Sequence, residues 1–392
     1  MRVLISADTH LGSPIRSAAL RNPALGESLK QASRDTFRTV VDLAIKENVG
    51  ALILAGDIFD NEFPDLKARA FLVTQLVRAS VAGVQTVLIR GNHDALLDQN
   101  VYGDLGPNIH LLHEGNPTVE IAGVAFHGLS FTTSHVVDSF LPDYPVPING
   151  KSNVGLMHTS LGGSLGHDHY APCSEHDLMA HGYDLWCLGH IHAPFERSLG
   201  SVLAVMPGIP QPRHFGERFG GSVAIVTLGD GPPVLEHHIV GKLRFVEIEL
   251  DLSESTNQSE VLQALGNELQ KVQDPVRDTA VRLLVTTARH TADDLNMLSN
   301  ELLDEIDRVF IDKVKSLPPK KPAGDKSNDL VRHMRDELNE VGFQQASAQV
   351  LEELRNALPA DIRDELSEEP LDELFEDAIN EVHVSLHGVD TQ

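Results

Sequence analysis

Residues 51–60, ALILAGDIFD, hold the pattern that decides the fold. A short apolar run ends at a glycine, and an aspartate, Asp57, follows at once. Runs of this length that end at a glycine are typical of buried strands. Ligands of α/β sheets gather beyond the carboxyl ends of the strands. The stretch therefore predicts a buried strand that presents Asp57 at a binding site.

Four other apolar runs end in the same way. The polar residues that follow them are, in chain order, Asp8 and His10 in DTH, Asn92, His93 and Asp94 in GNHD, His158, and His190 and His192 in GHIH. Each motif alone is a weak or moderate signal, because such residues also serve as helix caps and hydrogen-bonding groups. All five motifs in this order, each after a strand, indicate one site assembled from distant parts of the chain.

The donor atoms of this set are carboxylate and amide oxygens and imidazole nitrogens, without a thiolate. They suit Mn²⁺, Fe or Zn²⁺, and they are richer in nitrogen than the sites of Mg²⁺ or Ca²⁺. The candidate ligands are Asp8, His10, Asp57, Asn92, His158, His190 and His192. They are too many for one catalytic ion with an open position. Two ions about 3.5–4 Å apart could share a bridging carboxylate and clamp the attacking and leaving oxygens of a phosphoryl displacement.

The order of predicted elements indicates an α/β fold. In residues 1–240, β-branched runs first alternate with helical patterns, and strand then follows strand. This predicts two facing mixed sheets flanked by helices. Residues 241–316 are expected to form a small α/β cap domain, with strands at 245–250 and 281–286 and helices at 260–272 and 293–313. Residues 317–392 are expected to be a linker rich in Pro, Gly and Lys at 317–328, then an acidic tail with helices at 329–341, 345–358 and 362–382.

Composition excludes some classes of protein. The net charge is -26, and residues 251–392 carry 14 Lys and Arg against 31 Asp and Glu. This argues against a simple DNA-coating protein, but not against an enzyme whose bound ions supply positive charge. No apolar run approaches the roughly 20 residues that span a bilayer, so no membrane association is expected. The two cysteines, Cys173 and Cys187, lie outside any C-x-x-C pattern, so the cytoplasm is the expected compartment.

In its five motifs the chain resembles the calcineurin-like metallophosphoesterase superfamily. The resemblance implies the following ligands: Asp8, His10 and His192 for one ion, Asn92, His158 and His190 for the other, and Asp57 as the bridge. His93 resembles the family's second-sphere histidine, which approaches the scissile phosphate, and Asp94 would orient its ring. Two divalent ions are therefore expected, with Mn²⁺ preferred and Fe or Zn²⁺ as alternatives.

Two motifs narrow the resemblance to the DNA-repair exonuclease branch, with its SbcD-like and YhaO-like groups. These are DTHLG at 8–12 and GDIFD at 56–60. GLMHTSLGG at 155–163 and PGIPQPRHFGE at 207–217 are closer to the YhaO-like group. The resemblance implies an exonuclease or endonuclease that hydrolyses phosphodiester bonds of DNA in repair, with an SMC-like ATPase as partner. A homodimer is a further alternative.

Two other functions stay open. The first is a metallophosphoesterase of a small nucleotide or phosphomonoester, although a small substrate needs neither the cap nor the tail. The second is a non-catalytic scaffold, against which the complete ligand set argues. Arg213 and His214 lie in a Pro- and Gly-rich loop and are candidates for contact with phosphate, with a plain surface loop as the equal alternative. A loop is also the favoured interpretation of the ligand-like pair His167 and His169.

Overall fold

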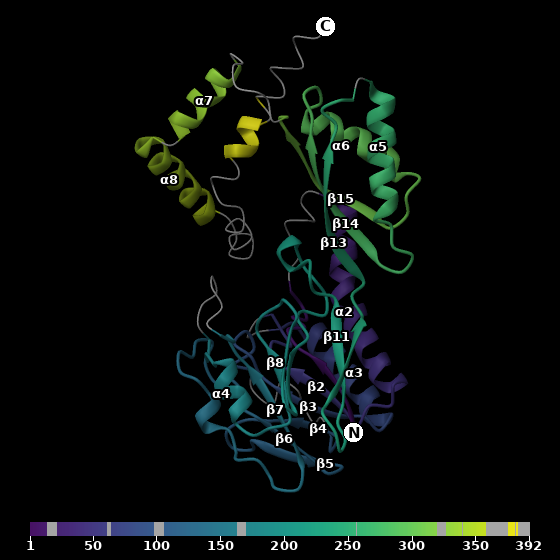
Figure 1. The fold of residues 1–392 in the computed structure, drawn as a ribbon, viewed down its shortest axis with the longest axis vertical. Coiled ribbons are helices and arrows are strands. Elements are labelled where there is room, and N and C mark those ends of the chain that lie inside the picture. The colour runs from purple at the N-terminus through teal and green to yellow at the C-terminus, as the bar shows by residue number, and fades with distance from the viewer. Residues whose placement is uncertain are drawn as a thin grey trace. The chain divides into compact units, whose positions relative to one another are not determined.

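The computed structural model describes residues 1–13, 22–60, 64–97, 106–162, 170–255, 257–319, 327–338, 340–357, 375–380 and 382. By its internal contacts the chain divides into two compact units. The first unit holds Met1–Ser13 and Lys30–Arg244. The second unit holds the described residues of 22–29 and those from Phe245 onward. Figure 1 labels many of the elements of both units.

Two six-stranded sheets make up the centre of the first unit (Figure 1). The first sheet has the order β12-β11-β1-β2-β3-β4, with β1 at Arg2–Ser6, β2 at Ala51–Ala55, β3 at Gln85–Ile89, β4 at Ile109–Leu111, β11 at Ser222–Thr227 and β12 at Val234–Ile239. The second has the order β5-β6-β7-β8-β10-β9, with β5 at Thr118–Ile121, β6 at Val124–Gly128, β7 at Ser152–His158, β8 at Leu185–Gly189, β9 at Phe195–Leu199 and β10 at Val202–Met206. Both sheets are mixed, because parallel strands are joined by antiparallel ones at their edges.

Apolar side chains form three layers around these sheets. Ile53 of the first sheet and Leu156 of the second belong to the layer between them. Residues 30–46 of α2 (Pro23–Lys46), together with α3 (Leu66–Val81), cover the outer face of the first sheet, where Leu72 is fully buried. The helix α4 (Glu175–Ala180) covers the second sheet, where its Leu178 packs with Trp186. The prediction of two facing mixed sheets flanked by helices is confirmed.

A three-stranded sheet forms the centre of the second unit. Its order is β13-β14-β15, with β13 at Leu243–Asp251, β14 at Asp278–Thr286 and β15 at Val309–Leu317. Two amphipathic helices, α5 (Gln258–Lys271) and α6 (Ala292–Leu303), pack their apolar faces on it through residues such as Leu265 and Leu298. Thr291 and Asp294 form a capping box that fixes the start of α6. The tail contributes α7 (Ser327–Leu338) and α8 (Val341–Ala357).

The expected helix over 293–313 is wrong in its second half. The helix α6 ends at Leu303, and Arg308, with φ 63°, turns the chain into β15. Val309, Ile311 and Val314 are buried, and β15 pairs in parallel with β14. Pairing and burial of these β-branched residues outweigh the weak helical periodicity. The strands β9 and β12 were not predicted, because they lie at sheet edges and are mostly exposed.

Parts of the predicted tail lie outside the described residues. This applies to 320–326 of the expected linker and to most of the helix expected at 362–382. The helices expected at 329–341 and 345–358 correspond to α7 and α8. The division into 1–240, 241–316 and 317–392 stays a prediction. Within the described part of the chain, no helix is long and apolar enough to cross a membrane.

Candidate metal centre

Strand ends gather the candidate ligands. The strands β1, β2 and β3 run parallel in one sheet, and β7 and β8 run parallel in the other. Asp8, Asp57 and Asn92 follow the first three strands, His158 is the last residue of β7, and His190 follows β8. Parallel strands end at the same edge of a sheet, so residues far apart in sequence meet there.

The ligand atoms lie within a few ångströms of one another. Three groups have donor atoms that are all within 4.8 Å of each other: Asp8, His10 and His192; Asp8, Asp57 and His158; and His10, Asp60 and His93. Asn92 joins the second group, because its Oδ1 lies 3.0 Å from His158 Nε2 and 3.2 Å from His190 Nδ1. The backbone N–H of His190 donates to both carboxylate oxygens of Asp8, at 3.0 and 3.1 Å. All seven candidate ligands therefore meet in one place.

The backbone at this place is strained. Asp8, His10, Asp57 and His190 have φ angles of 52°, 45°, 48° and 101°. They are four of the eight non-glycine residues with positive φ in the described part of the chain. Such conformations are uncommon, cost energy and cluster at functional sites. Gly91 is required for a different reason: a Cβ there would lie 2.2 Å from Asp57 Oδ1.

The contacts of His158 test whether the site fits a cation. Its Nδ1 lies 3.0 Å from the carbonyl oxygen of Ala55, which can only accept, so Nδ1 carries a proton. In the neutral ring, Nε2 then has a lone pair. That atom faces Asn92 Oδ1 at 3.0 Å and Asp57 Oδ2 at 3.3 Å, which are also acceptors. Without a metal ion, a second ring proton fills this place, because the charge of Asp57 outweighs burial and raises the pKa of His158 to about 9. A metal ion can replace that proton between the three acceptors, so these residues fit a metal ion.

Charges in the site are strongly coupled. Burial alone would raise the pKa of Asp57, but the charge of His158 and the hydrogen bond to it hold that pKa well below its usual range. Burial raises the pKa of Asp8, against the opposing charges of His158 and His192. Burial lowers the pKa of His10 to about 4, and the charge of Arg213 acts in the same direction. The site thus combines an ionised carboxylate with a neutral imidazole, the protonation states that bind metals.

Residues 1–194 match the family model described as calcineurin-like phosphoesterase. This chain carries a calcineurin-like phosphoesterase domain. The resemblance inferred from the five motifs is confirmed. Proteins of this family hold a dinuclear metal site, and the described residues include candidate ligand groups for it.

Several curated proteins are similar to the chain. The uncharacterized metallophosphoesterase YhaO of Bacillus subtilis is 27% identical over 288 residues, which cover 71% of this chain and 70% of YhaO. The DNA double-strand break repair protein Mre11 of Methanopyrus kandleri is 26% identical over 238 residues, which cover 55% of this chain and 50% of Mre11. A subunit of the nuclease SbcCD from Staphylococcus epidermidis is 22% identical over 225 residues, which cover 50% of this chain and 58% of the Staphylococcus protein.

Solved structures are more distant. A dimetal phosphatase from Danio rerio has a TM-score of 0.39 and 14% identity, over 62% of this chain and 98% of its own. The protein TT1561 of Thermus thermophilus has a TM-score of 0.38 and 15% identity, over 61% of this chain and 98% of its own.

His93 lies at the rim of the cluster of candidate ligands. Its side chain is exposed, and its ring centroid is 5.0 Å from that of His10. Its backbone N–H donates to Asp57 Oδ1 at 2.9 Å, and its Nδ1 lies 3.0 Å from the carbonyl oxygen of Asp60. A carbonyl only accepts, so Nδ1 carries a proton. The other ring nitrogen, Nε2, takes no part in this contact.

Asp94 has a different role from the expected one. We expected it to orient the ring of His93, but both of its carboxylate oxygens accept from backbone N–H groups. Oδ1 accepts from Gly91 at 2.7 Å, and Oδ2 accepts from Ile58 at 2.9 Å and from Phe59 at 3.4 Å. Asp94 is fully buried. It therefore joins the loops after β2 and β3, and the backbone of Asp60 holds the His93 ring in its place.

The structure places Arg213 beside the site and turns its guanidinium toward the protein. Nη1 lies 2.9 Å from Asp60 Oδ1, and Nη2 lies 2.7 Å from Glu217 Oε1. His214 caps the short helix at Phe215–Glu217 and lies 3.3 Å from Glu217 Oε1. Their contact with phosphate stays a prediction. His167 and His169 lie outside the described residues.

Sequence reasoning missed Asp60 and Glu217. His192 Nδ1 lies 2.7 Å from Glu217 Oε1, and His10 Nδ1 lies 3.0 Å from Asp60 Oδ1. Both acids stand in motifs quoted above, GDIFD and PGIPQPRHFGE, but no spacing rule marks them. The signal that could have found them is chemical, because a ligating imidazole usually donates its other ring N–H to a carboxylate or carbonyl.

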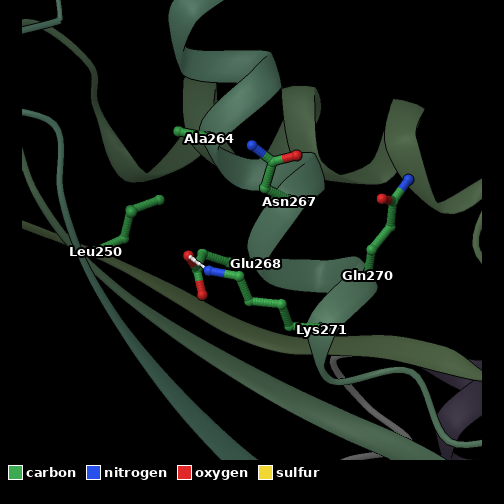
Figure 2. Close-up of a pocket in the computed structure, with 6 residues that line it drawn as sticks. All are labelled: Leu250, Ala264, Asn267, Glu268, Gln270 and Lys271. Atoms are coloured by element: carbon green, nitrogen blue, oxygen red, sulfur yellow. Dashed lines mark hydrogen bonds and ion pairs between the residues drawn. The ribbon is translucent and has the colours of Figure 1, made fainter.

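A depression of the second unit is not related to these motifs. It has a volume of about 550 Å³ and is lined by Leu250, Ala264, Asn267, Glu268, Gln270 and Lys271. Figure 2 shows that Lys271 reaches across to Glu268, whose Oε1 lies 2.6 Å from its Nζ. The two charges compensate each other, and no lining residue is a predicted site residue. The depression therefore carries no chemistry of its own.

Proposed function

We propose that the protein is a two-metal phosphodiesterase that hydrolyses DNA. The observation that carries the proposal is the convergence of two carboxylates, one amide and four imidazoles, with ring nitrogens that face other acceptors. The proposed ligands are Asp8, His10 and His192 for one ion, Asn92, His158 and His190 for the other, and Asp57 as the bridge. The donor set favours Mn²⁺, with Fe or Zn²⁺ as alternatives.

The chain's own residues supply the rest of the chemistry. When bound, divalent ions act as Lewis acids that offset the charge developing on phosphate oxygens. Asp57 holds the candidate ligand His158 and the loop of His93 in place. One of its oxygens faces His158, and the other accepts from the backbone N–H of His93. In the protonated, imidazolium form of His93, Nε2 holds the proton that the leaving nucleoside oxygen takes up. Asp94 fixes the loops that carry Asn92 and Asp57.

DNA as the substrate is supported by the names of the relatives. Mre11 is named as a DNA double-strand break repair protein, and the Staphylococcus protein as a subunit of the nuclease SbcCD. The second unit gives further support, because a small phosphoester would not need it. The proposal includes a role in repair, a cytoplasmic location and, from the resemblance above, an SMC-like ATPase as partner. A homodimer is an alternative assembly.

The test compares substrates and metals in one experiment. The full-length chain is freed of metal with chelator, and Mn²⁺, Fe²⁺, Zn²⁺ or Mg²⁺ is added back. End-labelled single- and double-stranded DNA are then digested over time, beside a cyclic nucleotide and nitrophenyl mono- and diesters. We expect metal-dependent cleavage of DNA, and its loss in Asp57→Asn, because that change removes the one charge shared by both ions.

Each other result contradicts a defined part of the proposal. DNA cleavage in excess chelator, or by Asp57→Asn, contradicts the two-metal chemistry. Cleavage of the small esters without cleavage of DNA supports the small-substrate alternative. Binding of metal without hydrolysis of any substrate supports the scaffold alternative.

A further inference from the structure

The ligands His10 and His192 present their nitrogens to each other. Their Nε2 atoms lie 3.1 Å apart, and their rings meet at 72°. On the opposite side of each ring stands a carboxylate: Glu217 Oε1 is 2.7 Å from His192 Nδ1, and Asp60 Oδ1 is 3.0 Å from His10 Nδ1. An ionised carboxylate only accepts, so His192 Nδ1 donates to Glu217 and its Nε2 has a lone pair, whereas His10 Nδ1 lies against Asp60 outside hydrogen-bond geometry. The pair is thereby set to bind a cation.

One guanidinium joins the two carboxylates. Arg213 Nη1 lies 2.9 Å from Asp60 Oδ1, and its Nη2 lies 2.7 Å from Glu217 Oε1. The backbone N–H of Arg213 also donates to Glu217 Oε2 at 2.7 Å. Guanidinium donors have fixed directions in one plane, so the two carboxylates are held at a fixed separation. A lysine ammonium is a point charge that cannot reproduce this fork.

The other half of the centre is held differently. His158 is oriented by the backbone carbonyl of Ala55, 3.0 Å from its Nδ1, at the last residue of β2. That contact depends on the sheet and not on any side chain. The two candidate metal sites therefore differ in what supports them. The histidines of one are supported by three charged side chains, Asp60, Arg213 and Glu217, whereas His158 of the other is oriented by a backbone carbonyl.

We propose that Arg213 is a positioning residue that acts through Asp60 and Glu217 on His10 and His192. It sets the affinity of the metal site at Asp8, His10 and His192 and leaves the site at Asn92, His158 and His190 unchanged. The inference rests on the proposed two-metal function. It also gives Arg213 a role other than contact with phosphate, because its donors are directed into the protein.

The test measures metal binding rather than activity. Full-length protein freed of metal is titrated with Mn²⁺ by calorimetry, and bound metal is counted after equilibrium dialysis. Arg213→Gln is expected to weaken one of two sites by about 10–100-fold, the usual effect of losing a partner of a ligating histidine. Arg213→Lys is expected not to restore it. Glu217→Gln, which keeps the side-chain volume, is expected to weaken the same site.

The matched control is Arg218→Gln. Arg218 lies in the same loop, and its guanidinium packs on the ring of Phe219, 4.9 Å from the centroid. This variant is expected to bind two ions as the unchanged chain does. Circular dichroism and thermal unfolding of the metal-free proteins show which variants fold. If Arg213→Gln does not fold, Glu217→Gln alone decides the outcome.

Three results would overturn the inference. Equal weakening of both sites would mean that Arg213 supports the whole loop region rather than one site. Two unchanged sites in Arg213→Gln, with weaker binding of DNA, would make Arg213 a substrate contact. Full rescue by Arg213→Lys would mean that charge alone matters. Failure of the unchanged chain to bind two ions would instead refute the two-metal function, so the two failures are distinguishable.

Discussion

Replacement of His93 by asparagine tests how the leaving group departs. The ring lies at the rim of the site with Nδ1 bonded to the carbonyl of Asp60, so in the imidazolium form Nε2 is the atom that can give a proton. A nucleoside oxygen leaves as a strongly basic alkoxide, whereas nitrophenolate is stable without a proton. We therefore expect His93→Asn to slow DNA cleavage by about 10²–10⁴-fold, the usual worth of acid–base catalysis. Cleavage of a nitrophenyl diester should fall much less.

The structure also limits the side effects of this change. In free energy, the expected loss on DNA corresponds to about 2.7–5.4 kcal/mol at about 1.36 kcal/mol per tenfold. The side chain of His93 is exposed, and the bond from its ring to Asp60 contributes about 0.5–1.5 kcal/mol to stability. The variant should therefore stay folded. It should also bind two ions, since its backbone N–H still reaches Asp57.

The assay measures kcat and bound metal on both substrates. The control is His176→Asn, which changes an exposed histidine on α4 and should leave both rates unchanged. Equal losses on DNA and on the nitrophenyl ester, with metal retained, would refute proton donation and make His93 a group that stabilises charge on phosphorus. Equal losses with metal absent would mean that His93 belongs to the ligand set. No loss on either substrate would remove His93 from the mechanism.

Two substitutions and one labelling experiment test the packing of the first unit. Gly155→Ala should lower the free energy of unfolding by about 1–3 kcal/mol or more, measured in denaturant, because the new Cβ would lie 2.3 Å from the ring of Trp186 and overpack the core. Asp94→Ala should lower thermal stability and the amount of bound metal together. Buried N–H groups left without an acceptor cost about 1–3 kcal/mol each. An unchanged metal content would contradict the role of Asp94 in holding the two loops. Cys173 and Cys187 should resist a thiol reagent at neutral pH until the chain is unfolded. Both are buried, and burial raises the pKa of Cys173 to about 11. Rapid labelling of the folded protein would contradict their burial.

The convergence of the candidate ligands could be predicted because its signal is local. A buried parallel strand is an uninterrupted apolar run, and the residue types just after it are visible in the sequence. In β2 all five residues are buried, and Asp57 follows two residues later. The order of such runs also predicted the two sheets. The edge strands β9 and β12 lacked this signal, since exposed strands have no apolar run.

The roles of supporting residues could not be predicted in the same way. An acid next to a histidine looks like its partner, and this led to the expectation for Asp94. In the folded chain, the carboxylate of Asp94 instead accepts from three backbone N–H groups. Glu217 stands 25 positions from His192, and only the fold brings them to 2.7 Å. Periodicity likewise could not show that β15 has β14 as its neighbour.

The loop after β2 connects these observations. Asp57 contacts His158 with one oxygen and the His93 backbone with the other. Three residues later, the Asp60 carboxylate lies against His10 and Arg213, and its carbonyl holds the His93 ring. The backbone between them is fixed by Asp94. Both candidate metal sites and the candidate proton donor therefore share one short segment. A change in this loop should alter metal binding and proton transfer together, whereas a change at Arg213 should separate them.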